Sequence, residues 1–309
     1  MPTESLSGPP PQVAIIGAGL MGHGIAQVFL LGGSTVRVWD PDEKALAGVP
    51  ARIDDHLALI GVARPADVQL AESIQQAAAG ADLIMEAAPE NLAVKRRLIA
   101  EFDDAAPGAI VATNTSVLRI SEIADGSAHP ERVVGTHWWN PPYLIPIVEV
   151  VPGEQTAKET VGRVSEWLRG VGKTVVPVRR DVPGFVGNRM QFALWREAMS
   201  IVQEGICDAE AVDLVARNTV GLRLAAIGPL TNADFIGLDL TKAIMDYLLP
   251  SLSTEQRAPG LVRELCEQGA FGAKSGRGIF PWPGQTRDEV EGRLLAHLLE
   301  QAGRPATRS

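Results

Sequence analysis

The stretch Gly17-Ala18-Gly19-Leu20-Met21-Gly22 fits the pattern GxGxxG and lies between an apolar run and a stretch with helical spacing. In this pattern the first glycine permits a tight turn, the second lets the backbone approach a pyrophosphate, and the third lets helix and strand pack closely. The free N–H groups at the N-terminus of the helix then suit the phosphates. The stretch therefore predicts a strand at residues 13–17, a helix at 20–31 and a dinucleotide-binding turn between them.

Asp40 ends the next predicted strand, at residues 35–40, and lies 18 residues after Gly22. An acidic residue about 20 residues after the glycine turn accepts hydrogen bonds from the adenosine ribose of NAD. A carboxylate there would repel the 2′-phosphate of NADP, and the following Pro41 supplies no compensating cation. The carboxylate therefore favours NAD over NADP. The glycine turn and Asp40 together favour a dinucleotide site over the alternative, an ordinary glycine-rich turn followed by a strand-end aspartate.

Beyond this unit the chain continues to alternate short apolar runs with helical stretches. Such alternation is typical of an α/β fold, a Rossmann-type mainly parallel sheet with helices on both faces. The further strands are predicted at residues 83–87, 109–113, 133–138, 147–151 and 174–178.

Strand signals end near Asp181-Val182-Pro183-Gly184. A long helix is predicted at residues 185–204, with Asp181 or a neighbour as its cap and Gly205 as its stop. An all-α C-terminal domain should follow. The expected division is a disordered tail (1–11), an NAD-binding Rossmann domain (12–182), a helical substrate and dimerisation domain (183–302) and a second tail (303–309).

The composition limits the partners. The 309-residue chain is 46% hydrophobic, with a formal net charge of −9 and scattered basic residues. Nucleic acid and a charged membrane surface are therefore not expected as partners. No apolar run reaches the ~18 residues of a membrane span, and the first residues lack the apolar core of a signal peptide. A cytoplasmic protein without a metal site is expected, with Cys207 and Cys266 as buried or half-buried thiols.

Among the five histidines, His137 stands out because it lies in the strand at 133–138, just before a proline-rich turn. If the chain folds back about Tyr143, Glu149 in the following strand lies opposite His137. A carboxylate within an apolar strand needs a partner. A histidine held in one tautomer by a carboxylate suits removal of a hydroxyl proton, although the pair could instead only brace the turn.

The other histidines have less distinctive surroundings. His23 lies in the glycine-rich turn, where it could simply shape the loop, and His129 precedes Pro130 in a loop. His56 and His297 lie in polar helical stretches and are expected to be solvated.

Taken together, these residues resemble the 3-hydroxyacyl-CoA dehydrogenase family over nearly the whole chain. The matching stretches are Gly17 with the turn up to Gly24, Glu90-Asn91 with Lys95, Asn114-Thr115-Ser116, the run from His137 to Glu149, the run from Asp181 to Arg189, Gly228-Pro229, Gly237-Leu238-Asp239, and Lys274-Ser275-Gly276-Arg277-Gly278-Ile279-Phe280.

The resemblance implies roles for individual residues. His137 would be the general base, Glu149 would orient it, Ser116 would bind the reacting oxygen, and Asn188 would complete the site. Without the resemblance, Asn114, Ser116 and Asn188 could equally be turn or cap residues. The cofactor residues implied beyond the glycine turn and Asp40 are Ala88, Glu90, Lys95 and Asn114, the last three along the nicotinamide half. The resemblance also implies a homodimer formed through the helical domain.

The region after the second strand departs from the acyl-CoA branch of the family. Members that bind CoA carry a lysine-rich helical arm there, whereas Arg52 and Arg64 are the only cationic residues between Ala45 and Val94. The same span holds seven acids: Asp54, Asp55, Asp67, Glu72, Asp82, Glu86 and Glu90. An acidic arm binds a nucleotide phosphate poorly.

The turn Trp138-Trp139-Asn140-Pro141-Pro142-Tyr143 also resembles the small-substrate branches, which act on carnitine, gulonate or a pyridine carboxylate. We therefore expect an NAD-dependent dehydrogenase that interconverts hydroxyl and carbonyl on a small 3-hydroxy or aromatic hydroxy/formyl carboxylate. The alternatives are a true 3-hydroxyacyl-CoA dehydrogenase and a non-enzymatic, crystallin-like or NAD-sensing protein.

Overall fold

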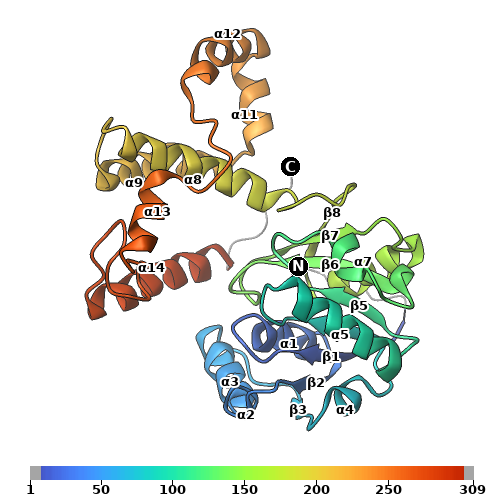
Figure 1. Cartoon of the computed structure of the whole chain (residues 1–309). Helices are drawn as coiled ribbons and strands as arrows, with labels where there is room; N and C mark the ends of the chain where they lie inside the picture. The colour runs from blue at the N-terminus through green and yellow to red at the C-terminus, as the bar shows by residue number, and fades with distance from the viewer. Residues whose placement is uncertain (1–7, 303–309) are drawn as a thin grey trace. The chain divides into compact units, whose positions relative to one another are not determined.

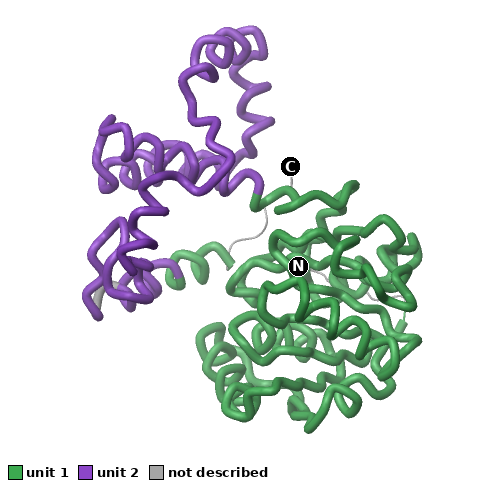
Figure 2. Tube along the Cα trace, viewed as in Figure 1, with its two compact units in different colours: residues 1–188, 295–309 green, residues 189–294 purple. Residues whose placement is uncertain are grey.

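A computed structural model of the chain describes residues 8–302, apart from the side chains of 285 and 286 (Figure 1). The predicted tail at 303–309 lies outside the described residues, as do residues 1–7 of the predicted tail at 1–11. The chain divides into two compact units, residues 1–188 with 295–309, and residues 189–294 (Figure 2).

The first unit is built on an eight-stranded sheet with the order β3-β2-β1-β4-β5-β6-β7-β8. Every neighbouring pair is parallel except β6 and β7, which run antiparallel. The strands are β1 Gln12–Ile16, β2 Thr35–Trp39, β3 Gln69–Leu70, β4 Leu83–Glu86, β5 Ile110–Thr113, β6 Val133–Trp138, β7 Ile147–Pro152 and β8 Thr174–Pro177. The predicted mainly parallel sheet is confirmed. One edge strand, β3, was not predicted, because two residues are too few to show a pattern in the sequence.

Helices cover both faces of this sheet (Figure 1). They are α1 Gly22–Leu31, α2 Glu43–Ala47, α3 Val49–Leu59, α4 Ile74–Ala78, α5 Leu92–Ala105, α6 Ile120–Ala124 and α7 Lys158–Gly170, with a 3-10 turn, η1, at Pro130–Arg132.

Two separate cores form because consecutive residues of a strand point to opposite faces. In β1, Val13 and Ile15 join the core under α1, α3 and α7, whereas Ala14 and Ile16 join the core under α4, α5 and α6. Strands buried on both faces read as continuous apolar runs, which is why the sequence revealed them.

After β8 the described residues form helices and loops, as expected, with two isolated β-bridges that pair Arg277 with Gly272 and Pro281. The helices are α8 Gly187–Gln203, α9 Ala209–Asn218, α10 Val220–Leu224, α11 Pro229–Ile236, α12 Leu238–Leu248, α13 Gly260–Glu267 and α14 Gly284–Ala302, with a 3-10 turn, η2, at Leu249–Ser251. The first long helix begins two residues later than predicted, because Gly184 and Phe185 adopt left-handed backbone angles, with φ of 73° and 48°.

Asp181 does not cap that helix, so this part of the prediction was wrong. Its two carboxylate oxygens accept hydrogen bonds from the backbone N–H groups of Ile120 (3.0 Å) and Ser121 (2.8 Å). Asp181 therefore caps the N-terminus of α6, whose own preceding residue, Arg119, makes no side-chain cap. The backbone turn at Gly184 and Phe185 lies between Asp181 and α8, so the aspartate is too early in the chain to cap it.

Two smaller expectations concern the surface. Cys207 is half-buried, but Cys266 is exposed, contrary to the prediction. Over the described residues, no helix is both long enough and apolar enough to cross a bilayer.

Candidate active site

The glycine-rich turn connects β1 to α1 at the carboxyl edge of the sheet. Gly17 has a φ of 111°, and a Cβ there would lie 2.6 Å from the carbonyl oxygen of Ala87. A Cβ on Gly22 would overlap the carbonyl oxygen of Gly17, whereas one on Gly19 would enter open space. Both tight positions therefore require glycine, and the space over Gly19 is free for a ligand.

The N-terminus of α1 has no side-chain cap, and Leu20 beside it is 66% exposed. Uncapped N–H groups facing open space suit an anion. Asp40, just after β2, binds the same turn, because its Oδ2 accepts the N–H of Ala18 at 2.6 Å. The carboxylate thus lies next to the turn, as recognition of a ribose requires, and the turn fits a dinucleotide.

His137 and Glu149 lie directly opposite each other in the antiparallel pair of β6 and β7, as predicted. Nδ1 of His137 lies 2.6 Å from Oε2 of Glu149, and both side chains are buried. Because a carboxylate can only accept, Nδ1 must carry the hydrogen. The Nε2 atom is then the free acceptor of the neutral ring.

Glu149 also organises the start of α8. Its Oε1 accepts the backbone N–H groups of Val186 (2.9 Å) and Gly187 (3.1 Å). Burial alone would raise the pKa of Glu149, but the hydrogen bonds from His137, Gly187 and Val186 outweigh it and lower the pKa below its usual value. The carboxylate is therefore ionised and fully engaged between the histidine and the helix.

Aromatic rings enclose His137. The Trp139 ring centroid lies 4.9 Å from that of His137, and Phe185 lies at 5.7 Å. A Cβ on Gly187 would overlap the Trp139 ring, so glycine is required for this packing. Trp138, by contrast, is buried in the core beneath the sheet. Of the two tryptophans in this turn, only Trp139 lies beside His137.

Asn188 and Ser116 are joined directly. Nδ2 of Asn188, which is buried, donates to the backbone oxygen of Ser116 at 2.8 Å. Asn188 directly follows Val186 and Gly187, whose N–H groups bind Glu149, so the start of α8 connects the pair of His137 and Glu149 with the pair of Asn188 and Ser116. All four belong to the first unit. Ser116 itself is exposed, so its hydroxyl is accessible.

Asn114 and Ala88 follow β5 and β4 at the same edge of the sheet. Oδ1 of Asn114 accepts the N–H of Trp138 at 3.2 Å, which ties the ends of β5 and β6 together. The N–H of Ala88 donates to Glu86, and its carbonyl oxygen lies 3.4 Å from Nζ of Lys95.

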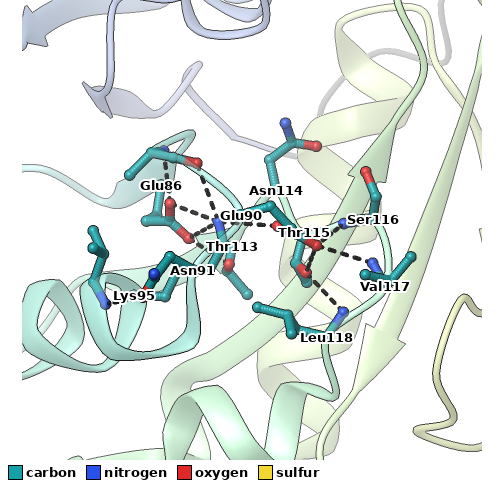
Figure 3. Close-up of polar contacts among 12 residues, drawn as sticks. Glu86, Glu90, Asn91, Lys95, Thr113, Asn114, Thr115, Ser116, Val117 and Leu118 are labelled. Carbon is teal, nitrogen blue, oxygen red and sulfur yellow. Dashed lines mark hydrogen bonds and ion pairs between the residues drawn. The ribbon is translucent and has the colours of Figure 1, made fainter. Parts of the chain in front are cut away.

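Lys95 is enclosed by protein, with no exposed side-chain surface. Its Nζ lies 2.9 and 2.8 Å from the two carboxylate oxygens of Glu86, which is equally buried (Figure 3). The sequence places Glu86 among the acids of the arm, but its side chain is buried at the end of β4, where it pairs with this lysine of α5. An acid at the end of the apolar run 83–86 is the same signal that singled out Glu149, and it could have identified Glu86.

A second buried lysine holds the turn that follows His137. Nζ of Lys173 donates to the carbonyl oxygens of Pro142 (2.5 Å) and Ile145 (2.9 Å) and lies 5.5 Å from the Trp138 ring centroid. Burial lowers its pKa to about 8. Nothing in the local sequence around Lys173 indicates this contact.

His56 is half-buried rather than solvated, which corrects the prediction. Its ring stacks on Tyr143 at 4.2 Å and lies 5.1 Å from His23. Three segments, α3, α1 and the turn after β6, therefore meet at these rings. His23 is buried, with Nδ1 2.6 Å from the carbonyl oxygen of Gly19, so it does shape the glycine turn.

Arg52 and Arg64, the two arginines between Ala45 and Val94, both bind groups within that same segment, which we call the arm. Arg52 donates to the carbonyl oxygens of Ala45 and Gly48, and Arg64 pairs with Asp54 and Asp67.

Comparison with known protein families gives two matches that together cover most of the chain. The model described as 3-hydroxyacyl-CoA dehydrogenase, NAD binding domain, matches residues 12–182. The model described as 3-hydroxyacyl-CoA dehydrogenase, C-terminal domain, matches residues 184–282.

Individual relatives extend over similar lengths. A 5-formyl-3-hydroxy-2-methylpyridine 4-carboxylate 5-dehydrogenase from Mesorhizobium japonicum is 37% identical over 284 residues, covering 89% of this chain and 92% of the relative. An L-carnitine dehydrogenase from Nocardiopsis dassonvillei is 37% identical over 303 residues, covering 94% and 88%. The crystal structure of a 5-formyl-3-hydroxy-2-methylpyridine 4-carboxylic acid 5-dehydrogenase, an NAD+-dependent dismutase, is similar with a TM-score of 0.90 at 34% identity, covering 96% of this chain and 100% of that one.

Proposed function

The chain belongs to the 3-hydroxyacyl-CoA dehydrogenase family, and we propose that it interconverts a hydroxyl and a carbonyl group on a small carboxylate with NAD as cofactor. The substrate class we infer is a compact 3-hydroxy acid or an aromatic hydroxy or formyl carboxylate. Relatives named for a pyridine carboxylate and for carnitine support this class.

The observation that carries the proposal is the buried contact of 2.6 Å between His137 and Glu149. With Nδ1 held by the carboxylate, Nε2 of His137 takes the hydroxyl proton during oxidation and returns it during reduction. Ionised Glu149 stabilises the imidazolium that forms. Ser116 and Asn188 hold the reacting oxygen.

The cofactor is assigned to the carboxyl edge of the sheet. Gly17, Gly19, Leu20, Met21 and Gly22 hold the pyrophosphate, and Asp40 holds the adenosine ribose and repels a 2′-phosphate. The wall toward the nicotinamide is formed by Ala88, Glu90, Lys95 and Asn114. Lys95 lies behind the other residues and does not contact the cofactor directly, because its side chain has no exposed surface. The nicotinamide, when bound, supplies the acceptor for the hydride.

A small substrate is favoured over an acyl-CoA by the charges of the arm. Binding a nucleotide phosphate needs free cationic groups, and each charge-assisted contact contributes on the order of 1.5–3 kcal/mol. Arg52 and Arg64 are already occupied by contacts within the arm.

A comparison of substrates tests the proposal. The purified protein is assayed with NADH on small 3-oxo and pyridine carboxylates and on acetoacetyl-CoA. A kcat/KM above about 10⁵ M⁻¹s⁻¹ for acetoacetyl-CoA, the normal range for a true substrate, would overturn the small-acid assignment.

The acid–base role is tested with His137→Gln, which we expect to lose roughly 10²–10⁴-fold in kcat. His129→Gln, in an exposed loop, is the matched control. Oxidation needs the neutral ring and reduction the protonated one, so the two rates should change with pH in opposite senses. Near-full turnover by His137→Gln would exclude His137, and loss of NAD binding in that variant would point to a structural pair.

We also propose that the protein is a cytoplasmic homodimer, with residues 12–182 as the NAD-binding domain and 183–302 as the substrate and dimerisation domain. Large apolar side chains on α11 and α12 support the dimer, since Leu230, Phe235 and Tyr247 are 84%, 83% and 89% exposed. Patches of this kind mark association surfaces. The free thiols Cys207 and Cys266 accord with a reducing compartment.

A further inference from the structure

The backbone of residues 115–118 is folded around a single carboxylate oxygen. Oε1 of Glu90 accepts three hydrogen bonds, from Oγ1 of Thr115 (2.6 Å), the N–H of Ser116 (2.9 Å) and the N–H of Val117 (3.0 Å). Thr115 Oγ1 in turn accepts the N–H of Leu118 at 3.1 Å, which closes the turn. Figure 3 shows these donors converging on Glu90.

Buried charge lies behind the other oxygen of Glu90. Oε2 is 3.7 Å from Nζ of Lys95, and Lys95 is fixed by its pair with Glu86. Glu86 is held in turn by the hydroxyl of Thr113, on the neighbouring strand β5. A buried ion pair with all its groups satisfied is rigid. Oε2 of Glu90 therefore lies next to a buried ion pair that joins the end of β4 to α5.

The electrostatics keep Glu90 ionised. Burial acts to raise its pKa, but the hydrogen bonds from Thr115 and Val117, the charge of Lys95 and the N–H of Ser116 lower it below the usual value. An ionised oxygen accepts such hydrogen bonds about twice as strongly as a neutral one.

Ser116 is consequently held from both sides. Glu90 binds its N–H, and Asn188 donates to its carbonyl oxygen. With the backbone held at both ends, rotation about χ1 is the main freedom left to the exposed hydroxyl.

We propose that Glu90, besides lying in the wall toward the nicotinamide, is a positioning residue that sets the placement of the Ser116 hydroxyl. This inference rests on the proposed function, in which Ser116 binds the reacting oxygen. A misplacement of about 1 Å can cost roughly 10²-fold in rate. Releasing Ser116 from Glu90 should therefore reduce kcat by a larger factor than it weakens the binding of NAD.

The decisive experiment is a double-mutant cycle with Glu90→Gln and Ser116→Ala. Glu90→Gln should lose roughly 10–100-fold in kcat, change its NAD dissociation constant by a smaller factor, and cause little further loss of kcat when Ser116 is already alanine. Independent, additive losses of kcat, or an NAD dissociation constant measured by calorimetry that rises by as large a factor as kcat falls, would overturn the positioning role and leave Glu90 only its place in the cofactor wall.

Asp103→Asn is the matched control. Asp103 also organises a turn, accepting hydrogen bonds from Ser127, Ala128 and Arg132, but that turn precedes β6, at the opposite end of the strand from His137. The Asp103→Asn variant should keep the kcat of the unaltered protein. An equal loss of kcat in Asp103→Asn would mean that Glu90 acts only through general stability.

A second readout needs no substrate. In Glu90→Gln the amides of Ser116 and Val117 should exchange hydrogen with solvent at least tenfold faster, and in Glu90→Asp, which retains the charge, by a smaller factor. Unchanged exchange at both amides in both variants would refute the positioning role. The proposed function fails separately, if Ser116→Ala and His137→Gln retain full turnover.

Discussion

At the scale of single residues, surroundings decide what a histidine does. His137 has a carboxylate on Nδ1, which leaves Nε2 as a base. His23 instead has a carbonyl oxygen on Nδ1 and is enclosed by protein, with His56 and Arg52 nearby. Burial lowers the pKa of His23 to about 4. The two rings are therefore suited to different tasks, proton transfer for His137 and a neutral packing role for His23.

This difference leads to a prediction about stability and pH. The pKa of His23 in the folded protein, about 4, lies below its ordinary value of 6.5. Between pH 4 and pH 6.5 the unfolded chain binds a proton on His23 that the folded protein does not. The free energy of unfolding is therefore highest above pH 6.5 and decreases as the pH falls. Lowering a pKa by one corresponds to about 1.36 kcal/mol, so the stability lost is on the order of 3 kcal/mol in total.

The measurement is the free energy of unfolding by urea at pH 7 and pH 4.5. The decrease on acidification should be smaller in His23→Gln than in the unaltered protein. His297→Gln, at an exposed position, should leave the decrease unchanged. Equal decreases in His23→Gln and the unaltered protein would contradict the prediction.

At the scale of elements, the site depends on contacts that link the start of one helix to a distant part of the chain. Asp181, after β8, caps α6, and Glu149 on β7 binds the N–H groups at the start of α8. Both carboxylates satisfy N–H groups that the helices leave unpaired. In this way the two caps fix both helix starts to the sheet, next to Ser116 and Asn188.

The cap on α6 can be tested by Asp181→Ala. The Asp181 side chain is only 4% exposed, so removing it leaves two part-buried N–H groups without their acceptor. The free energy of unfolding should fall by about 1–3 kcal/mol. Asp42→Ala removes the exposed cap of α2 and should cost only about 0.5–1 kcal/mol. A loss in Asp181→Ala no greater than in this control, measured by urea unfolding, would count against the assignment.

At the scale of the whole molecule, the second unit buries little of its own apolar surface. The helices α9 to α13 contain no fully buried residue, and large side chains on α11 and α12 are exposed. A helix with an apolar face needs another surface to cover it. A second copy of the chain is the occupant that we propose.

Light scattering should accordingly give twice the 32.9 kDa mass of the chain. Phe235→Asp places a charge on the most exposed apolar region and should shift the mass toward the monomer at micromolar concentration. Leu59→Asp, at an exposed apolar position on α3 of the first unit, is the control and should remain dimeric. A monomer mass for the unaltered protein over the same concentrations would refute the dimer.

Local patterns in the sequence were sufficient for the architecture. Buried parallel strands appear as apolar runs, and the glycine turn appears as fixed spacing, because both are set by the chain's own neighbouring residues. The pairing of His137 with Glu149 could also be predicted, since one turn joins β6 to β7 and brings the strands into register. The edge strand β3 escaped notice because two residues are too few to show a period.

Only the tertiary structure decided which hydrogen-bond donor meets which acceptor when the two lie far apart in the sequence. Asp181 binds the backbone of Ile120 and Ser121, and Asn188 reaches Ser116 across 72 residues. No spacing rule relates such positions, because they become neighbours only when the parallel strands align their carboxyl ends. The sequence by itself therefore determined the fold, the cofactor turn and the candidate base, while three-dimensional packing decided how Ser116 is held and where each buried charge finds its partner.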